Sequence, residues 1–422
     1  MSAVPVVWTS TMAVRQNSFE AGAIAVRELQ DWMEARDFAG YEPYDLLNSP
    51  LLAKAWLHRS AMTVVLTQVG RRWGGMKLRS LLRVPASKNP KGLALILASY
   101  CDRIWAGESC WKQAGYLKSE LKRLRSPGEE TFCWGYDWDV HLLRNTKMSA
   151  FSPHAIATVF GGQALLDFAE IAGDEEAAGM ALSAGKFIVS RLNRSVDTPT
   201  DLCFSYTPSD RGRVYNSSAL AGAFLARLHS LRGFAGGADL ARRVMHYLVG
   251  EQRGDGSWFY GAGRMQRWVD NFHTGYNLTA LLDYQQFTGD RSFDSAMQKG
   301  YDFYLRYFFD RDGAPKYFHN GRYPIDIHSC AQAILTFCAF SERDPNALKR
   351  ALEVASWTLR CMKGDDGAFY YQRHRLWLNK ATYMRWGQAW MFRALSRLHL
   401  LLVRGQETDS VRFLRQSLAA SG

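Results

Sequence analysis

The sequence repeats itself at an almost constant interval, and this feature constrains the fold more than any other. Segments that begin with a polar residue, continue with small residues and end in a bulky apolar run start at Thr158, Asn216, His273, His328 and Arg385. Successive starts are 55 to 58 residues apart. A second set of segments lies between them at the same interval. Each unit therefore holds two helical segments, as in repeat architectures.

The two sets differ in their hydrophobic pattern. ALAGAFLA (219–226) and AQAILTFCAF (331–340) are apolar nearly all round, which is typical of helices packed on both sides. The second set is amphipathic: Leu240, Val244 and Leu248 share one face, while Arg242 and Arg243 can face water. The alternation predicts two concentric rings, with the apolar helices inside and the amphipathic helices outside.

Each amphipathic helix is followed by an aromatic segment with the pattern of a β-hairpin. Three outer helices end in an Asp-Gly turn, at 255–256, 312–313 and 366–367. His319-Asn320-Gly321 then lies between Tyr317-Phe318 and Arg322-Tyr323, a strong turn signal. Similar pairs join 257–260 with 266–269 and 369–372 with 376–379. The repeating unit is helix, helix, hairpin.

Counting the units predicts an all-α fold, an (α/α)6 toroid of six helical hairpins with short β-hairpins at the cleft face. GLALILASYCDRI and ESCWKQAGYLKSELKRL supply an earlier helix pair, and residues 409–420 supply a short final outer helix. The length of 422 residues would suit two or three domains, but the repeat favours one integrated toroid over residues 89–422. Residues 1–88 are predicted to form an N-terminal helical appendage, with helices at 18–36 and 51–69 and a link at 85–92.

Charge and cysteine content bear on partners and compartment. The formal net charge is +12, which favours anionic partners, and we expect an anionic glycan or lipid-linked oligosaccharide rather than nucleic acid. The basic segment from Arg71 to Lys91, interleaved with Trp73 and leucines, predicts peripheral contact with an anionic membrane, unless it is only a solvated basic face. The seven cysteines form no C-x-x-C pair, and no signal peptide or membrane-spanning run stands out, so a cytoplasmic location is expected.

The inner helices indicate where chemistry would occur. In such a ring all their N-termini open on one face, where unpaired N–H groups and the positive helix dipole favour negative charge. Asp270 lies three residues before His273, and Asp326 lies two before His328. A carboxylate beside an imidazole sets the tautomer and basicity of that imidazole.

The sequence therefore predicts a shared cleft with two classes of residue. The acid/base candidates are Asp270, His273, Asp326, His328 and Tyr383. The substrate-binding candidates are Trp134, Tyr136, Asp137, Asn216, Trp268, Tyr323, Arg385 and Trp386. Alternatively, the aspartates only cap helices, the histidines are satisfied, partly buried residues, and Arg385 is a structural partner of an aspartate.

Two further alternatives have less support. Two histidines and two aspartates are able to ligate zinc or manganese, but no H-E-x-x-H or paired-cysteine pattern occurs, so no metal or cofactor is predicted. DWDV (137–140) partly matches the acidic motif of terpene cyclases, which leaves an isoprenoid-handling toroid as an alternative.

Longer strings along nearly the whole chain resemble a known bacterial family. They are EPYDLLNSPLL (42–52), CWGYDWDV (133–140), FSYTPSDRGRVYNSS (204–218), DNFHTGYNLTALLDY (270–284), PKYFHNGRYPIDIHSCAQAI (315–334) and YMRWGQAWMFRAL (383–395). They resemble the VpsJ-like polysaccharide biosynthesis proteins of surface-polysaccharide gene clusters. The resemblance implies a role in making or modifying an exopolysaccharide, capsule or O-antigen, and it brings no established reaction or catalytic residues.

Together these features predict a glycan-processing enzyme. It would act by hydrolysis or by abstracting the C5 proton of a uronate, as a lyase or an epimerase. The alternative of a different class is a non-catalytic glycan-binding or scaffold protein of the polysaccharide assembly machinery. The sequence does not separate hydrolysis from elimination, because this depends on the distance between two carboxylates.

Overall fold

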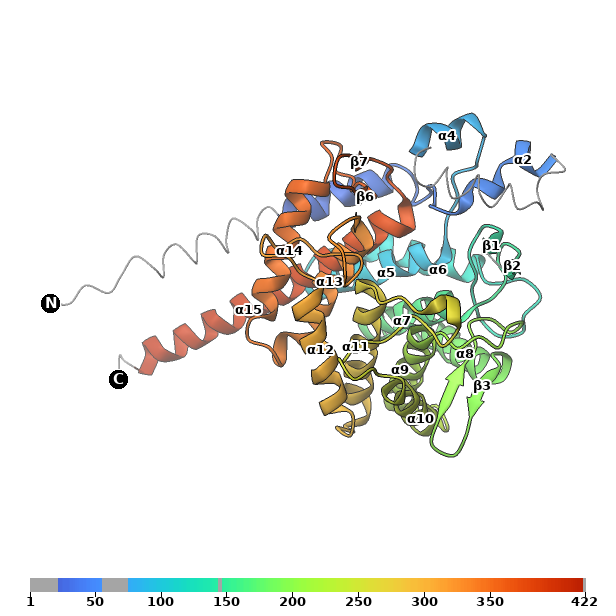
Figure 1. The fold of residues 1–422 in the computed structure, drawn as a ribbon. Helices are drawn as coiled ribbons and strands as arrows, with labels where there is room; N and C mark the ends of the chain where they lie inside the picture. Colours follow the sequence, from blue (N-terminus) through green and yellow to red (C-terminus); the bar gives the residue numbers. More distant parts are fainter. Residues whose placement is uncertain (1–21, 55–74, 143–145, 420–422) are drawn as a thin grey trace.

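The structure, a computed structural model, describes residues 22–54, 75–142 and 146–419 (Figure 1). Helices make up 60% of the described residues, and the strands are few and short. The predicted all-α toroid is confirmed.

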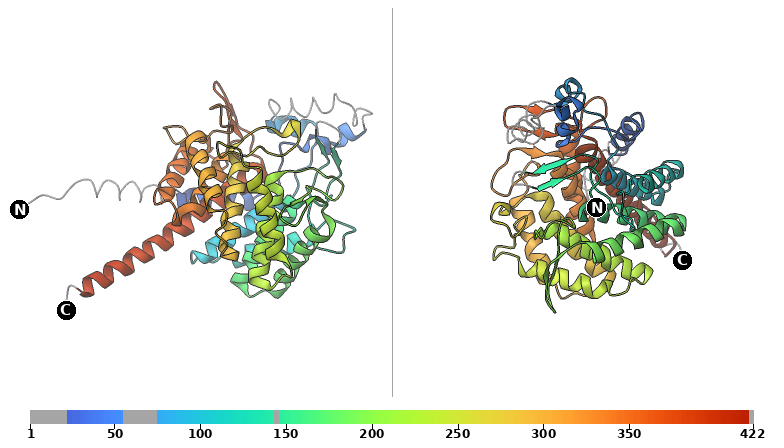
Figure 2. Two further views of the ribbon diagram at one scale, coloured as in Figure 1. Left: turned by 60° about the horizontal axis from the view of Figure 1, so that its bottom comes forward. Right: turned by 90° about the vertical axis from the view of Figure 1, so that its right-hand side faces the viewer.

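Six inner helices form a closed ring. They are α5 (Pro90–Trp105), α7 (Ala155–Ala172), α9 (Tyr215–Arg232), α11 (Asn271–Thr288), α13 (Ile327–Ala339) and α15 (Trp390–Ala419). Each packs on the next in chain order, and α15 packs on α5, so the ring closes (Figure 2). Small residues allow the close approach: a Cβ on Gly162 of α7 would lie 2.3 Å from the Phe224 ring of α9. This explains why the repeat places small residues near the start of each inner helix.

Five outer helices pack against the inner ones. They are α6 (Trp111–Arg123), α8 (Glu175–Arg191), α10 (Gly237–Gly250), α12 (Asp294–Tyr307) and α14 (Ala347–Met362). Each lies against the inner helix that precedes it in the chain. Their apolar stripes are buried, as Leu240, Val244 and Leu248 of α10 illustrate, and their polar faces reach solvent.

The sixth outer position is filled by the helix at residues 22–34. Its Leu29 and Met33 are fully buried in the core of the ring. The Asp-Gly turn after α10 contacts α12 at Lys299, and the turn after α12 contacts α14 at Glu353. The turn after α14 contacts Glu28 in the same way, and Trp32 donates a hydrogen bond to Asp366 in that turn. Helix 22–34 is therefore the outer partner of α15.

This arrangement corrects two expectations. Residues 409–420 do not form a separate outer helix, because α15 continues without a break to Ala419. The helix predicted near 18–36 is part of the ring rather than an added layer, since its apolar face completes the core between α14, α15 and α5. The predicted boundary between residues 88 and 89 thus does not separate helix 22–34 from the toroid. The helix predicted at 51–69 lies mostly outside the described residues.

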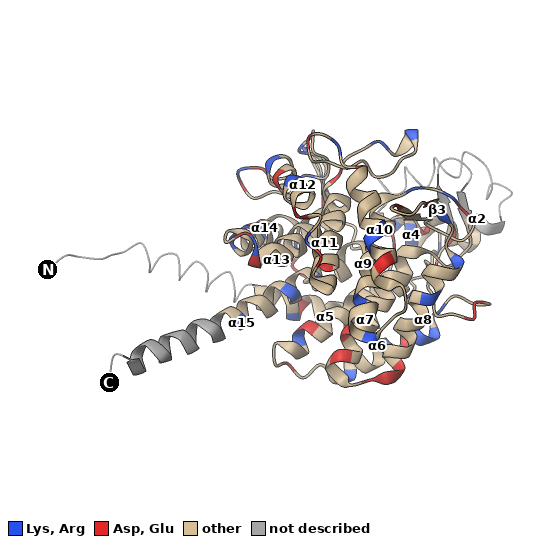
Figure 3. Ribbon diagram, turned by 90° about the horizontal axis from the view of Figure 1, so that it is seen from below, with Lys and Arg blue, Asp and Glu red and all other residues tan. Residues whose placement is uncertain are grey.

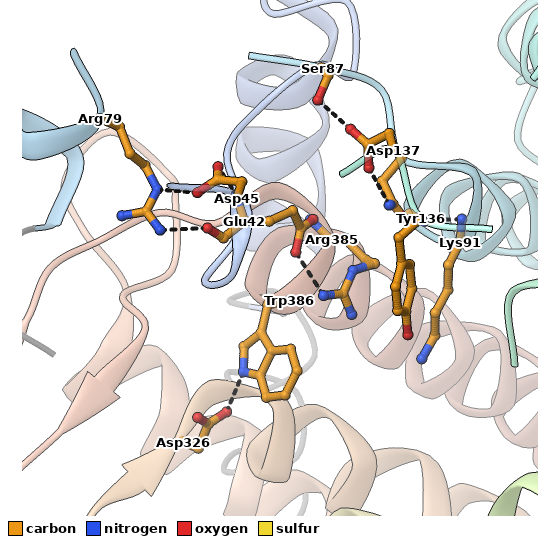
Figure 4. Close-up of polar contacts among 12 residues, drawn as sticks. Glu42, Asp45, Arg79, Ser87, Lys91, Tyr136, Asp137, Asp326, Arg385 and Trp386 are labelled. Atoms are coloured by element: carbon orange, nitrogen blue, oxygen red, sulfur yellow. Dashed lines mark hydrogen bonds and ion pairs between the residues drawn. The ribbon is translucent and has the colours of Figure 1, made fainter. Parts of the chain in front are cut away.

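The remaining N-terminal elements are short and lie beside the ring. They are η1 (Asp45–Asn48), α2 (Pro50–Lys54) and α4 (Gly75–Leu81). A fully buried ion pair joins them, because Arg79 of α4 donates to Asp45 of η1 at 2.7 Å and to the Glu42 carbonyl at 2.6 Å. This pair fixes the segment around Glu42, which reaches the end of the ring described below (Figure 4).

The hairpins are reduced to short ladders and bridges. The strands are β1 (Val140–Leu142), β2 (Thr146–Met148), β3 (Arg194–Asp197), β4 (Leu202–Phe204), β5 (Ile325–Asp326), β6 (Gln372–Arg373) and β7 (Leu378–Asn379), and the helical turns η4 (Arg264–Gln266), η5 (Phe340–Glu342) and η6 (Met384–Ala389) complete the chain. The antiparallel pair β6–β7 confirms the predicted hairpin at 369–379. The hairpin predicted at 317–323 keeps one bridge, between Phe318 and Gly321, and the one at 257–269 keeps backbone hydrogen bonds, such as Tyr260 N–H to the Trp268 carbonyl.

The three predicted hairpins also pair with segments that enter inner helices, the first through a bridge between Gly261 and Val214. Asp270, before α11, bridges to Phe318, and β5, before α13, pairs with β6. The hairpins therefore hold in place the residues that cap the inner helices.

Cysteines and charges complete the description. All seven cysteines are free, and six are buried, as expected for small apolar side chains. By length and composition α7 alone among the described helices is apolar enough to cross a membrane, and 67% of it is buried in the ring. Acidic and basic residues are interspersed over the outer helices (Figure 3).

Candidate functional site

All six inner helices present a polar side chain in or next to their first turn, at one end of the ring. These residues are Lys91 (α5), His154 (α7), Asn216 (α9), His273 (α11), His328 (α13) and Arg385 (η6, leading into α15). Electrostatic effects of Lys91 and Arg385 reach both His154 and His328. Because of the repeat, six segments far apart in the sequence each bring one polar side chain to the same end of the ring.

Asp270 holds the side chains of two neighbours. It caps α11 by accepting the backbone N–H of His273 at 2.9 Å. Its other oxygen lies 2.7 Å from Nδ1 of His273 and accepts the indole N–H of Trp268 at 2.8 Å. The carboxylate is 2% exposed, whereas the imidazole is 20% exposed. Asp270 thus fixes the ring of His273 with its protonated Nδ1 toward the carboxylate and Nε2 available for chemistry.

His328 is buried in a cluster of aromatic rings. Its ring stacks on Phe272 at 4.4 Å and on Trp390 at 4.5 Å. Nε2 lies 2.7 Å from the hydroxyl of Tyr276, while Nδ1 has no partner among the described residues. Burial, with Lys91 and Arg385 nearby, lowers the pKa of His328 well below its usual value. The imidazole is therefore neutral at pH 7.

The two histidines share neighbours, so they belong to one site. The ring of Phe272 lies 4.2 Å from that of His273 and 4.4 Å from that of His328. The ring of Tyr276 lies 5.9 Å from the first and 6.0 Å from the second. Tyr276 is buried, which raises the pKa of its hydroxyl well above the usual value. It was not among the predicted residues, because a tyrosine in the second turn of an apolar helix is ordinarily a core residue.

Asp326 plays the same structural part at α13 as Asp270 does at α11. It caps the helix through the N–H of His328 at 2.8 Å, and it accepts the indole N–H of Trp386 at 2.9 Å. Gln372 of β6 donates to its second oxygen at 2.7 Å. Both aspartates are therefore helix caps, as one alternative had it, and each also orients a partly exposed tryptophan. The ring of Trp386 in turn meets that of His328 at 4.8 Å.

Arg385 is paired, but not with either aspartate. Its guanidinium lies 2.8 Å from the carboxylate of Glu42, which also accepts the Arg385 backbone N–H (Figure 4). Both side chains are almost fully buried, and burial raises the pKa of Glu42 to about 8. The guanidinium carbon is 4.9 Å from the centre of the Tyr136 ring and 5.4 Å from that of Trp386. Glu42 escaped the prediction because it comes from outside the repeat.

Two basic groups in the site were missed as well. His154 is the N-cap of α7, where Nδ1 accepts the Ala157 N–H. Its ring is tilted against that of Tyr136 at 4.3 Å and stacks on that of Tyr206 at 5.2 Å, and burial lowers its pKa to about 3. The repeat held the signal for His154, since it lies four residues before Thr158. Lys91 had been assigned to a basic surface segment.

Several predicted residues have other surroundings. Trp134 is fully buried, and its indole N–H donates to the Leu121 carbonyl, so it packs the core and does not present a face for sugar stacking. Asp137 accepts from Ser87 and from Asn89, whose own side chain caps α5 (Figure 4). Asp137 therefore positions the helix that carries Lys91.

The other substrate-binding candidates are distributed over the same end of the ring. Tyr323 is 37% exposed, and Asn216 is buried in the first turn of α9. Trp268 stacks on Tyr260 at 4.5 Å. Tyr383 belongs to a small separate cluster with Tyr371, and its role as an acid or base stays a prediction.

The rival chemistries find no geometric support among the described residues. No group of three or more His, Cys, Asp or Glu side chains there is arranged to hold a metal ion. The aspartates of DWDV accept hydrogen bonds from their own chain, Asp137 as above and Asp139 from the Ala150 N–H.

Part of the basic segment is buried or paired, while Lys77, Leu81 and Arg83 are exposed, so contact of this segment with a membrane stays a prediction. Arg79 is buried against Asp45, Lys88 is paired with Asp37 and Glu120, and Lys91 is 3% exposed. Carboxylates pair with Arg79 and Lys88, and aromatic rings surround Lys91, so these three side chains do not contribute to an exposed basic face. Arg71, Arg72 and Trp73 lie outside the described residues.

No protein-family model and no curated protein matches the sequence. Solved structures do resemble the fold. A cellobiose 2-epimerase from Bacillus thermoamylovorans B4167 has a TM-score of 0.60 at 12% identity, over 75% of this chain and 90% of that one. A GH76 α-mannanase from Bacteroides thetaiotaomicron has a TM-score of 0.56 at 13% identity, over 76% and 88%. A D-mannose isomerase has a TM-score of 0.54 at 11% identity, over 73% and 86%. At these identities the similarity establishes the toroid.

Proposed function

We propose that the protein is a carbohydrate-processing enzyme that transfers a proton at a sugar carbon, as an epimerase or a lyase does. The observation that carries this proposal is the pair formed by His273 and Asp270. The carboxylate holds Nδ1 at 2.7 Å and leaves Nε2 of a partly exposed imidazole as a base. Such a base can remove a proton from a carbon next to a carbonyl, or next to a carboxylate whose charge a neighbouring cation neutralises.

The hydroxyl of Tyr276, hydrogen-bonded to the neutral His328, provides the matching proton donor. His328 reaches Tyr276 through Nε2, and its Nδ1 has no partner among the described residues. A base on one side and a donor on the other are what inversion at a carbon requires, because the proton leaves one face and returns to the other. Elimination uses the same base and protonates the leaving oxygen instead.

Hydrolysis receives less support from the same geometry. It requires a carboxylic acid that protonates the leaving oxygen and a second carboxylate that acts as base or nucleophile. Asp270 and Asp326 each accept from their helix N-terminus and from an indole N–H, so their oxygens are already engaged. The histidines are the groups with available nitrogen atoms.

The similar structures support a carbohydrate substrate, since they are a cellobiose epimerase, an α-mannanase and a mannose isomerase. The resemblance of motifs such as EPYDLLNSPLL to surface-polysaccharide proteins supports a glycan chain or lipid-linked oligosaccharide from such a cluster as substrate. Glu42 and Asp45 of that motif bond to Arg385 and Arg79, so this string serves the site directly.

The test is incubation of the full-length protein with oligosaccharides of the cognate cluster in deuterated water, followed by NMR. Deuterium at a ring carbon identifies an epimerase, and a new double bond identifies a lyase. His273→Gln should abolish either signal while the protein still binds the glycan. A new reducing end would overturn the proposal in favour of hydrolysis, and binding without any product would favour the scaffold alternative.

A further inference from the structure

Lys91 is a buried lysine without an acidic partner. It is the second residue of α5, and 3% of it is exposed. Its ammonium nitrogen lies over three aromatic rings, 4.5 Å from the centre of Phe160, 5.1 Å from Trp390 and 5.8 Å from Tyr276. Lys88, one turn earlier, has ion pairs with two carboxylates, and nothing in the described part of the chain plays that role for Lys91.

The charges that act on Lys91 leave its ammonium uncompensated. They come from Arg385 and Glu42, which are paired with each other at 2.8 Å. Burial, and secondly Arg385, lower the pKa of Lys91 well below its usual value. Asp137 and Asn89 nevertheless hold this end of α5 in place, so the lysine is positioned where its charge is costly. Such an arrangement is expected where a ligand supplies the missing negative charge.

Other buried donors at this end of the ring also lack acceptors. Nε of Arg385 and the side-chain nitrogen of Asn216 donate to no atom among the described residues. A guanidinium nitrogen can only donate, so only an acceptor satisfies it. The guanidinium of Arg385 lies over the ring of Tyr136, 4.9 Å from its centre, and its charge reaches Lys91 (Figure 4). The group that completes this site is therefore rich in acceptors.

The geometry points to Lys91, with Arg385 beside it, as the site that binds the carboxylate of an acidic sugar. The substrate class is then a hexuronate, alone or as a unit of an anionic glycan. One unpaired ammonium matches the single charge of a carboxylate, whereas a phosphate dianion would leave charge uncompensated. This inference deepens the proposed function and rests on it, because a carboxylate also acidifies the neighbouring C5 proton that His273 would remove.

Calorimetric titration of the full-length protein tests the inference without turnover. The probes are methyl glucuronide, methyl glucoside and glucose 1-phosphate. The wild type should bind the glucuronide roughly 10- to 100-fold more tightly than the glucoside, the range expected for a hydrogen bond to a charged group. Lys91→Met should remove this preference and leave the affinity for the glucoside unchanged. Methionine fits among aromatic rings and removes a buried charge, so the variant should unfold at the same or a higher urea concentration.

Lys186→Met is the matched control. Lys186 is exposed on α8, so the change in net charge is the same but distant from the site, and the preference should persist. Equal affinity of the wild type for glucuronide and glucoside, or no binding of either, would overturn the inference; this comparison needs no variant. Tighter, Lys91-dependent binding of glucose 1-phosphate would replace the carboxylate by a phosphate.

The outcome is separable from that of the proposed reaction. Lys91-dependent glucuronide binding without deuterium exchange would retain the acidic-sugar site and reject the proton-transfer chemistry. Exchange into a neutral sugar with no preference for the uronate would do the reverse.

Discussion

Replacing Asp270 by asparagine should disable His273 without unfolding the ring. The carboxylate accepts three N–H groups: the backbone N–H and Nδ1–H of His273 and the indole N–H of Trp268. An asparagine amide has the same shape as the carboxylate, but it offers one acceptor oxygen and one NH₂ donor in place of two acceptor oxygens. If the amide oxygen keeps the helix cap, the NH₂ group faces the indole and the imidazole.

The magnitudes follow from these bonds. The imidazole can accept from the new NH₂ group only by moving its own proton from Nδ1 to Nε2, which removes the base at Nε2. The rate should therefore fall by about 10²- to 10⁴-fold, the usual contribution of a general base. The indole N–H of Trp268 is left without an acceptor, which should cost about 1–3 kcal/mol of unfolding free energy.

Asp174→Asn provides the matched control. Asp174 also caps a helix, accepting the Ala177 N–H at 2.9 Å, but its other partner is Lys118 in a partly exposed ion pair. An asparagine keeps this cap, and the ion pair is worth about 1 kcal/mol or less. This variant should lose little stability and no activity.

Three measurements check the prediction. Nitrogen-15 NMR of the imidazole reports which ring nitrogen carries the proton, urea unfolding reports stability, and deuterium incorporation reports turnover. A variant of Asp270 that keeps the Nδ1–H tautomer and the wild-type exchange rate would refute the role assigned to the carboxylate. The same loss of activity in the Asp174 variant would point to a general effect on folding.

Three further outcomes are expected. Gly367→Ala should destabilise the protein by more than Gly289→Ala in urea unfolding, because both glycines have positive φ angles, +86° and +74°, but only at Gly367 would the new Cβ meet helix 22–34, 3.0 Å from Glu28. Equal losses would contradict the closure of the ring by that helix. His154→Asn should make the unfolding free energy less sensitive to acid between about pH 6.5, the pKa of an unfolded histidine, and pH 3. The buried imidazole of the wild type has a lowered pKa, so as pH falls only the unfolded state binds the extra proton. This lowers the unfolding free energy of the wild type by about 1.4 kcal/mol per pH unit. Parallel slopes of unfolding free energy against pH would refute this. Uronate binding should be coupled to protonation of Lys91, because the bound carboxylate favours the ammonium form, and it should weaken as pH rises above the lowered pKa of Lys91. Calorimetric titrations in buffers of different ionisation enthalpy measure the proton uptake. The absence of proton uptake at every pH would contradict the assignment.

The helical toroid was predictable from the sequence alone because its constraints are periodic and local. The recurrence from Thr158 to Arg385 and the contrast between apolar and amphipathic helices are properties of consecutive residues, and they predicted the ring before any contact was known. The pairing of Asp270 with His273 was predictable for the same reason, since residues three apart meet at a helix N-terminus.

Contacts between distant parts of the chain were decided only by the tertiary structure. Helix 22–34 lies at the other end of the chain from α15, and it closes the ring because its apolar face fits the last open position beside that helix. Glu42 reaches Arg385 across 343 positions of sequence, and no spacing rule connects them. Lys91 looked like part of a basic surface because its neighbours in sequence are basic, yet its neighbours in space are aromatic rings. Sequence order determines which residues share a helix face, whereas burial and charge depend on what the other segments bring to that face.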